Sequence, residues 1–493
     1  MSDAAAGRWW WTPVAGAIFS IAAVLAAPVS GLGASAAVGV VQSGDGWLAP
    51  FVGTFVTGCV FWGLLVGWPR RLSLLRAGLA GGLVGLGATP VVLAIADFGT
   101  GGPVDPARLG ERSFGILELA LLTTITTGFV AMAIMVAVGM LIALLLRRVY
   151  PRRGAALPAS WVLRAGAVGL TVVVLSLAGA YVWLSQLPLE ATALTEQRVR
   201  GEPASSYEAA LAAFEAVRAA EAMLPLNPDC HSRLLTHGRR VARSVVYLHG
   251  LTNCPLQAEQ LAQQLFERGY NVYVPRWPGH GEADQMTLAL TTLSAEQMVA
   301  STDGAIDLAR GLGDEVVVIG MSAGGAMTAW AAQYRADVGR TVAVSPFLGP
   351  HFVPPWANRA AANLLLLMPN MMLAWNPLEP EGAPGMEHSY PRIPTHALAQ
   401  FMRLGEVLQA AAQQSPPQAM SLGMLLNDAD FAVNNALAWQ LVAAWRAEGR
   451  TVDLEVLPRS DLLPHDLVDP RMPGARTELV YPALLELIER RSR

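Results

Sequence analysis

The feature that most constrains the fold is a stretch in which a strand, a tight turn and a helix follow one another without a spacer. Residues 316–319 read V-V-V-I, a β-branched run typical of a buried parallel strand. G-M-S-A-G follows at 320–324, and small residues then begin a helix. A serine at such a turn takes a strained backbone conformation, and the flanking glycines give the turn room. The stretch therefore predicts that Ser322 is a nucleophile raised above a sheet edge.

The composition divides the chain into parts of different character. Hydrophobic residues make up 53% of the 493 residues and charged residues only 15%, which is apolar for a soluble protein. The chain also exceeds the length of one ordinary domain. We expect a membrane region at 1–187, a linker at 188–240 and an α/β domain at 241–493. The net charge is −4 and no basic run occurs, so nothing indicates nucleic-acid binding.

Five apolar runs in the first part are long enough to cross a bilayer, which takes about 20 residues each. They lie at 13–41, 47–68, 74–96, 116–146 and 161–187. Arginines gather in the loops at 69–76 and 147–164, whereas the connection at 41–46 has only one charge, Asp45, and the loop at 97–113 is mixed. Because basic loops stay cytoplasmic, the pattern predicts five crossings and a carboxy-terminal domain outside the cytoplasm. Ionisable residues are almost absent from the runs, which favours an anchor over a carrier.

The absence of lysine and the abundance of alanine and glycine are typical of a GC-rich bacterial genome. The expected location is therefore the inner (plasma) membrane of a bacterium, with the α/β domain on the extracytoplasmic side.

From residue 241 onward, β-branched runs alternate with helical patterns. Strands are predicted at 244–248, 271–275, 316–319, 340–345, 419–425 and 452–457. Such alternation implies a mainly parallel sheet with right-handed crossovers. In the linker, a capping box at Ser205 and Glu208 predicts an amphipathic helix.

One block, residues 346–394, breaks the alternation. It is rich in Pro, Met, Trp and Leu and follows a predicted strand. So much exposed apolar surface would be costly unless it covered something, and a methionine-rich surface suits flexible acyl chains. We therefore expect a cap, or lid, over the active site.

A serine nucleophile needs a base, and the base needs an orienting carboxylate. For a serine on such a turn, the expected chain order is serine, acid, histidine. The predicted strand at 419–425 runs into Asp428 and Asp430, and His465 is the only histidine after either acid. His465 is therefore the base by elimination. Either carboxylate could orient it, and either could instead cap the following helix.

The motifs together resemble the α/β-hydrolase superfamily, especially its carboxylesterase and monoglyceride-lipase-like members. The resemblance runs from about residue 241 to the end. It is carried by H-G-L at 249–251, P-G-H-G at 278–281, G-M-S-A-G at 320–324, D-F-A-V at 430–433 and His465. The five apolar runs have no counterpart in it. It implies an α/β-hydrolase fold, a mainly parallel sheet with a cap insertion.

The same resemblance implies roles for individual residues. Ser322 would be the nucleophile, His465 the general base and acid, and Asp430 the orienting carboxylate. The Asp-x-x-Val pattern of the family favours Asp430 over Asp428. The oxyanion donors implied are the backbone N–H groups of Leu251 and Ala323, and no metal or cofactor is implied.

Cys230 and Cys254 flank the first strand of the predicted domain. Outside the cytoplasm a disulfide between them is permitted, and it would join the linker to the loop that supplies an oxyanion donor. Metal binding is not expected, because no further cysteine or suitably spaced histidine accompanies the pair.

These features predict a membrane-anchored serine hydrolase that cleaves carboxylic esters through an acyl-enzyme on Ser322. The tether and the apolar cap favour a lipid or lipid-like ester, so the expected partners are that substrate and the bilayer. Two alternatives remain open. The same triad could transfer the acyl group to an acceptor other than water, or the chain could be a membrane protein whose hydrolase-like domain has lost activity.

Overall fold

The computed structural model describes residues 15–19, 48–62, 64–65, 75–84, 135–136, 138–140, 142, 178–189, 194, 203–375 and 385–490. The chain forms two compact units, Met1–Val182 and Trp183–Arg493. We call them the amino-terminal unit and the carboxy-terminal unit and describe each by itself. Of the five predicted membrane spans, the one at 47–68 lies mostly within the described residues, and the other four lie mostly outside them. Within the described residues, no helix has both the length and the apolar character that a bilayer crossing requires.

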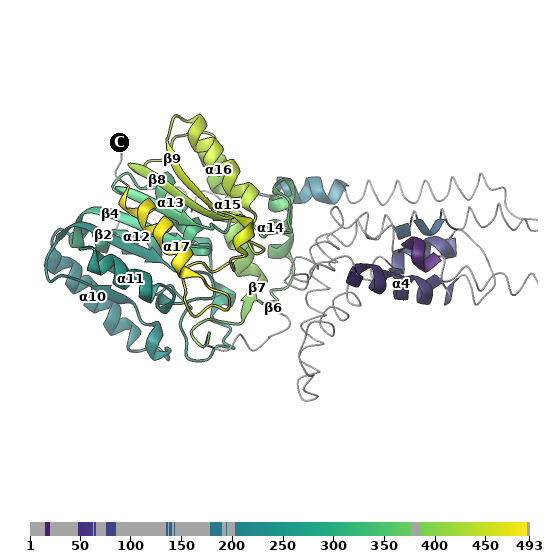
Figure 1. Cartoon of the computed structure of the whole chain (residues 1–493), viewed down its shortest axis with the longest axis horizontal. Helices are drawn as coiled ribbons and strands as arrows, with labels where there is room; N and C mark the ends of the chain where they lie inside the picture. Colours follow the sequence, from purple (N-terminus) through teal and green to yellow (C-terminus); the bar gives the residue numbers. More distant parts are fainter. Residues whose placement is uncertain are drawn as a thin grey trace, which may run out of the picture. The chain divides into compact units, whose positions relative to one another are not determined.

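A seven-stranded sheet forms the centre of the carboxy-terminal unit (Figure 1). Its strands are β1 (Arg233–Leu235), β2 (Val241–Leu248), β3 (Asn271–Val274), β4 (Gly313–Met321), β5 (Arg340–Val344), β8 (Ser421–Asn427) and β9 (Val452–Leu457), in the spatial order β1-β3-β2-β4-β5-β8-β9. Every pair is parallel except β1 with β3. The predicted mainly parallel sheet is confirmed, and the carboxyl ends of its parallel strands meet at one edge.

Helices cover both faces of the sheet (Figure 1). Val245 and Val317 pack in one buried core with residues of α11 (Glu259–Glu267) and α17 (Thr477–Glu489). Successive strand residues point to opposite faces, and Ser244 accordingly donates a hydrogen bond of 2.8 Å to the carbonyl of Ala309 in α12 (Ala295–Leu312).

The face that α12 covers also carries α13 (Ala323–Tyr334) and α16 (Asn435–Ala447). A second layer lies over it, because α10 (Tyr207–Glu221) packs on α12, and α15 (Thr395–Ala412) packs on α13 and α16. Both sides of the central strands are therefore buried, which explains their continuous apolar sequence.

The block predicted as a cap leaves the sheet after β5 and ends at the start of α15. It contains η7 (Pro355–Ala357), α14 (Asn358–Leu367) and the antiparallel pair β6 (Met372–Ala374) and β7 (Arg392–Pro394). Residues 376–384 lie outside the described ranges. Helix α14 packs against α15, and the buried Asn358 side chain donates to the Leu348 carbonyl at 3.2 Å and to Glu406 at 2.8 Å.

The first residues of the carboxy-terminal unit bind to its helices through their carbonyl groups. Arg359 and Asn363 of α14 donate to the carbonyls of Leu187 and Leu184, each at 2.8 Å. The Leu189 carbonyl accepts from Arg403 of α15, and the Leu194 carbonyl accepts from Trp330 of α13 at 3.0 Å. The side chains of three helices therefore hold this segment.

Two local predictions are corrected by the structure. The amphipathic linker helix exists as α10, but its amino-terminal cap is Ser206 and not Ser205, because the Ser206 hydroxyl accepts from Ala209 N–H at 3.1 Å. The antiparallel edge strand β1 was not predicted. Three residues are too few to show an alternating pattern, and pairing with β3 alone makes them a strand.

Two glycines in α12 have opposite surroundings. A Cβ added at Gly304 would meet nothing within 4 Å, whereas one at Gly311 would lie 2.4 Å from the Ser206 carbonyl at the start of α10. We predict that Gly304→Ala raises the free energy of unfolding by about 0.5–1 kcal/mol through helix propensity. Gly311→Ala should lower it by about 1–3 kcal/mol through overpacking. Thermal unfolding of the purified chain measures both, and shifts of the same sign would contradict this packing.

Candidate active site

Ser322 lies at the turn between β4 and α13 in a conformation that side chains rarely adopt. Its φ is 58° and its ψ is −112°, and such strain persists only where the surroundings impose it. Its N–H donates to the Val344 carbonyl and its own carbonyl accepts from Phe347 N–H, both at 2.9 Å. A Cβ on Gly324 would lie 1.9 Å from the carbonyl oxygen of Leu248. The turn is therefore fixed to β2 and to the end of β5.

Three side chains from three strand ends form a continuous hydrogen-bonded chain. Nε2 of His465 lies 2.9 Å from Oγ of Ser322, and Nδ1 of the same ring lies 2.8 Å from Oδ2 of Asp430. His465 and Asp430 are both buried. Asn427, at the end of β8, donates to the carbonyls of Leu463 and Pro464 and so holds the loop that carries His465.

The two carboxylates that the sequence left as alternatives have different surroundings. Oδ1 of Asp430 accepts from the N–H groups of Ala432 and Val433 at 2.9 and 3.2 Å, which aims Oδ2 at His465. The Asp428 side chain is 56% exposed and faces Arg459 at 3.6 Å. The structure thus brings Asp430, and not Asp428, to the histidine.

The charges around His465 favour the protonated form of its imidazole. Burial lowers the pKa of His465, but the charge and hydrogen bond of Asp430 and the charge of Asp466 outweigh it, so the pKa is raised above its usual value. A base with this environment is neutral only above that raised pKa, and it readily holds the proton that Ser322 releases.

The predicted oxyanion donors lie on the two sides of Ser322. Ala323 is the first residue of α13, so its N–H has no acceptor within the helix. Leu251 follows the end of β2, and a Cβ added on its neighbour Gly250 would lie 3.9 Å from the Cβ of Ser322. Residues 249–253, which we call the oxyanion loop, contain Leu251, and the Leu251 carbonyl is hydrogen-bonded to His280. The site can therefore present two backbone N–H groups to a developing oxyanion.

Comparison with known families gives this geometry a chemical class. Residues 239–454 match the family described as "Hydrolase_4: Serine aminopeptidase, S33". The chain is a serine hydrolase. The matched region contains Ser322 and Asp430 and ends before His465, which the structure itself brings to them. No curated protein matches the chain.

Several solved structures resemble this hydrolase over about half of its length. One belongs to a study of LipS and LipT, two metagenome-derived lipolytic enzymes, with 19% identity and a TM-score of 0.41 over 53% of this chain and 98% of that one. Another is a monoacylglycerol lipase of Paleococcus ferrophilus, with 19% identity and a TM-score of 0.38 over 52% and 97%. A soluble variant of monoglyceride lipase from Saccharomyces cerevisiae has 11% identity and a TM-score of 0.38 over 52% and 90%.

Two other histidines of the hydrolase lie near the site but are buried and structural. Burial and the neighbouring His280 hold the pKa of His249 well below its usual value, and burial lowers the pKa of His280 to about 4. Nε2 of His249 accepts from Trp277 N–H at 3.3 Å. Both rings are therefore neutral at ordinary pH.

The block predicted as a cap reaches His465 through one aromatic side chain. The Trp375 ring lies 5.8 Å from the His465 ring, and Trp375 N–H donates to the Pro391 carbonyl at 2.8 Å. The residues just before β7 also contact the loop that follows β2, because Tyr390 N–H donates to the Thr252 carbonyl at 2.8 Å. The cap segment therefore borders the triad and the oxyanion loop together.

The structure joins Cys230 and Cys254 in a disulfide, with an S–S distance of 2.05 Å. Cys230 ends the turn η4 (Pro228–Cys230), and Cys254 precedes η5 (Pro255–Ala258) directly after the oxyanion loop. Both sulfurs are buried. The linker is thus covalently attached to the loop that carries Leu251.

The sequence reasoning missed the polar residues that support the site. Asp466, next to the base, binds Gln257 and Asn253 of the oxyanion loop region, and Asp469 contacts His388 at 2.6 Å. A carboxylate directly beside His465 was visible in the sequence. Its partners lie about two hundred residues away in the chain, so only the fold brings them together.

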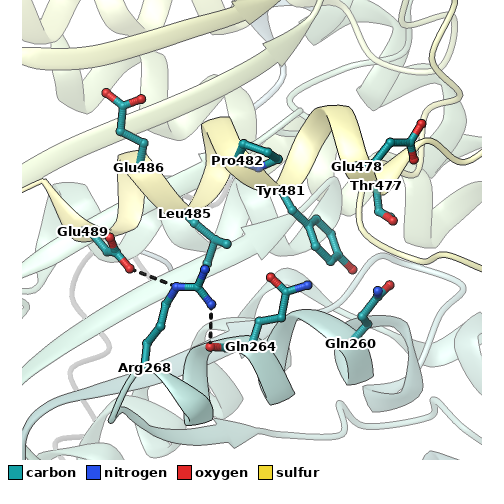
Figure 2. A pocket seen from close by; sticks show the side chains of 10 residues that line it. All are labelled: Gln260, Gln264, Arg268, Thr477, Glu478, Tyr481, Pro482, Leu485, Glu486 and Glu489. Atoms are coloured by element: carbon teal, nitrogen blue, oxygen red, sulfur yellow. Dashed lines mark hydrogen bonds and ion pairs between the residues drawn. The ribbon is translucent and has the colours of Figure 1, made fainter.

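A surface cavity of the hydrolase lies elsewhere, between α11 and α17 (Figure 2). Arg268 crosses it, contacting Glu489 at 3.2 Å and the Gln264 carbonyl at 3.0 Å. None of its lining residues belongs to the triad or to the oxyanion loop, so this cavity takes no part in the chemistry.

We predict that Cys230 and Cys254 resist alkylation in the denatured, non-reduced protein and react after reduction. Cys59, whose thiol takes no part in this disulfide, serves as the internal control for complete alkylation. Replacing both cysteines by serine should lower the free energy of unfolding by about 3 kcal/mol, because the bond closes a loop of 24 residues. Labelling of all three cysteines before reduction would refute the disulfide.

Proposed function

We propose that this serine hydrolase cleaves carboxylic esters through an acyl-enzyme on Ser322. The observation that carries the proposal is the chain of hydrogen bonds from Ser322 Oγ to His465 at 2.9 Å and from His465 to Asp430 at 2.8 Å. A serine hydroxyl becomes a useful nucleophile only when an oriented base can take its proton. The geometry provides that base.

In the first half-reaction, Nε2 of His465 takes the proton of Ser322 as Oγ attacks the ester carbonyl carbon. The carbonyl π electrons move to oxygen, and the N–H groups of Leu251 and Ala323 stabilise this oxyanion. When the tetrahedral intermediate collapses, His465 gives its proton to the departing alcohol. Asp430 keeps Nδ1–H of the ring in place and stabilises its positive charge throughout.

In the second half-reaction, water replaces the alcohol. His465 takes a proton from the water, whose oxygen attacks the acyl carbonyl, and the same two N–H groups stabilise the second oxyanion. The acid leaves, and Ser322 recovers its proton from His465. Transfer to an acceptor other than water would differ only in this step, so the dependence of turnover on added alcohols distinguishes the two reactions.

A lipid-like ester is the substrate class that the surroundings of the triad favour. Apolar side chains are exposed on the cap and on the loop beside it, namely Met286, Leu288, Trp356, Leu367 and Trp375. The loop is joined to the cap by Arg392, which donates to the Met286 carbonyl at 2.9 Å. Exposed apolar side chains on a segment that borders the triad through Trp375 suit a substrate with a long acyl chain.

We further propose that the amino-terminal unit is a membrane anchor. Exposed large side chains on its described helices are apolar, including Val56, Val60, Leu64, Leu75, Leu79 and Leu83. Small residues such as Ala77, Ala80 and Gly81 face the interior, and a Cβ on Gly81 would lie 1.9 Å from the Met135 carbonyl. Small residues at helix contacts and apolar residues outside are the pattern of helices in lipid. A water-soluble bundle would have polar side chains outside.

The arginine-rich loops support a hydrolase domain on the extracytoplasmic side of a bacterial plasma membrane. In this proposal residues 1–187 form the anchor, 188–240 the linker and 241–493 the hydrolase domain. The buried pair Cys230 and Cys254 fits an oxidising compartment. Alkylation of these cysteines in the native cell tests the placement, and fully reduced thiols there would contradict it.

A fluorophosphonate probe should label Ser322, because its phosphorus accepts the activated Oγ as an ester carbonyl does. Ser322→Ala and His465→Ala should each lower kcat by on the order of 10⁶-fold, and the double variant should be no worse, since triad members act as a unit. Asp430→Ala should cost less, about 10⁴-fold. Asp428→Ala is the matched control and should stay within about twofold of wild type, because exposed side chains contribute little. An unlabelled Ser322 in folded protein would refute the enzyme mechanism.

The cap proposal is tested with a series of esters of increasing acyl length. We expect medium and long acyl chains to be preferred over acetyl, and Trp375→Ala to lower kcat/KM most for the long chains, because the indole borders His465. Removing one large apolar contact should cost about 10- to 100-fold. Trp439→Ala, an exposed tryptophan on α16, is the control and should change nothing. A preference for acetyl esters would instead indicate a small, non-lipid substrate.

A further inference from the structure

The carboxylate next to the catalytic base has an unusual set of partners. Asp466 is buried, and its two oxygens accept four hydrogen bonds. Oδ1 accepts from the N–H groups of Val468 and Asp469 at 3.0 and 3.1 Å, within its own loop. Oδ2 accepts from Gln257 at 2.6 Å and from Asn253 at 3.1 Å, across the site. All four contacts are donors, so the group functions as an ionised acceptor.

Gln257 carries the connection on to the oxyanion loop. Its Nε2 donates to Asp466, while its Oε1 accepts from Gly250 N–H at 3.0 Å and from the Tyr247 hydroxyl at 3.3 Å. Gln257 is fully buried, and its amide orientation is fixed because only one end can donate. Gly250 directly precedes Leu251, whose N–H is a proposed oxyanion donor.

Asn253 makes a second, parallel connection. Its Nδ2 donates to Asp466, and its Oδ1 accepts from Cys254 N–H at 3.1 Å. The two amides therefore hold the loop at both ends, before Leu251 and after Thr252. Backbone N–H groups stabilise an oxyanion only when they are aimed beforehand at the place where the charge develops.

We propose that Asp466 is a positioning residue that couples the loop of the catalytic base to the oxyanion loop through Gln257 and Asn253. The proposal rests on the function proposed above, since it assigns Asp466 to the same site. One loop supplies the group that moves the proton and the other an N–H group that stabilises the charge. A carboxylate anchored in the first and bonded to the second fixes the distance between these two groups.

The charged and titratable groups around Asp466 are His465, Asp469, Tyr247 and Tyr481, with His388 and Arg471 beyond Asp469. Burial and the charge of Asp469 raise the pKa of the Asp466 carboxyl, and its four N–H donors act against that shift. The negative charge of Asp466 in turn adds to that of Asp430 in raising the pKa of His465. Removing the charge of Asp466 should therefore change the pKa of His465.

Asp466→Asn tests the coupling with a minimal change of shape. The N–H groups of Val468 and Asp469 should keep the amide oxygen of the new side chain at the Oδ1 place, which leaves its NH₂ facing Nε2 of Gln257. Two donors then meet, and Gln257 can satisfy the new NH₂ only by turning its oxygen away from Gly250. We expect kcat for a small ester to fall about 10- to 100-fold with KM unchanged, because the oxyanion forms only in the transition state.

The double variant Asp466→Asn with Gln257→Glu restores the pairing. A carboxylate at 257 accepts from the new NH₂ with one oxygen and from Gly250 N–H with the other. Gln257→Glu alone sets two buried carboxylates against each other and should also lose activity. We expect the double variant to recover at least about tenfold in kcat over either single variant, as coupled residues do.

The pH dependence of kcat/KM is a measurement that a purely structural role of Asp466 would leave unchanged. The acid limb of kcat/KM reports the pKa of His465, which must be neutral to accept the serine proton. Asp466→Asn removes a negative charge that raises this pKa, so the limb should shift to lower pH. Asp461→Asn, a carboxylate in η8 (Arg459–Asp461) ahead of the same loop, is the control and should leave kcat and the limb unchanged.

The outcomes separate this inference from the function on which it rests. If wild-type Ser322 is not labelled by the fluorophosphonate, the proposed function fails first. If Ser322 is labelled and Asp466→Asn retains wild-type kcat and an unshifted limb, the coupling is wrong. It is equally wrong if the double variant loses the product of the two single effects with no recovery. Should the single variants fold poorly, recovery of thermal stability without recovery of kcat in the double variant would also overturn it.

Discussion

The close packing of the start of α13 against the end of β2 is the constraint on which the rest of the site depends. The helix can approach the Leu248 carbonyl only because residue 324 has no side chain. That approach brings the first free N–H of the helix beside the loop that follows β2. It also forces Ser322 into its positive-φ conformation, held by hydrogen bonds to Val344 and Phe347. A single steric condition thus sets the nucleophile and both proposed oxyanion donors at once.

Two carboxylates then serve one histidine loop in different ways. Asp430 contacts the imidazole directly and has its second oxygen occupied by backbone N–H groups. Asp466 instead accepts hydrogen bonds from the side-chain amides of Gln257 and Asn253. Both carboxylates are buried, and the charges of both raise the pKa of His465. Their hydrogen bonds fix the position of the histidine loop, and their charges set the pKa of its imidazole. The cap segment adds a third border through Trp375 and Tyr390.

Local patterns predicted much of the carboxy-terminal unit. The β-branched runs predicted its parallel strands, because strands buried on both faces have a continuous apolar sequence. The position at a strand end left both Asp428 and Asp430 possible, because the two differ only in where the turn points them. Only the Asp-x-x-Val resemblance favoured Asp430, the residue that contacts His465 in the structure. The hydrogen bond between Asp466 and Gln257 could not be predicted from the sequence at all. Hydrogen bonds between segments two hundred residues apart have no local signal.

The carbonyl groups at the start of the carboxy-terminal unit have a mechanical consequence. The carbonyls of Leu184, Leu187 and Leu189 accept hydrogen bonds from Asn363, Arg359 and Arg403 respectively, and the first two of these donors lie on helix α14. These bonds fasten the segment mainly to α14, while Ser322 and His465 follow strands of the central sheet. A force on this segment would therefore reach α14 before it reached the strands that carry the triad.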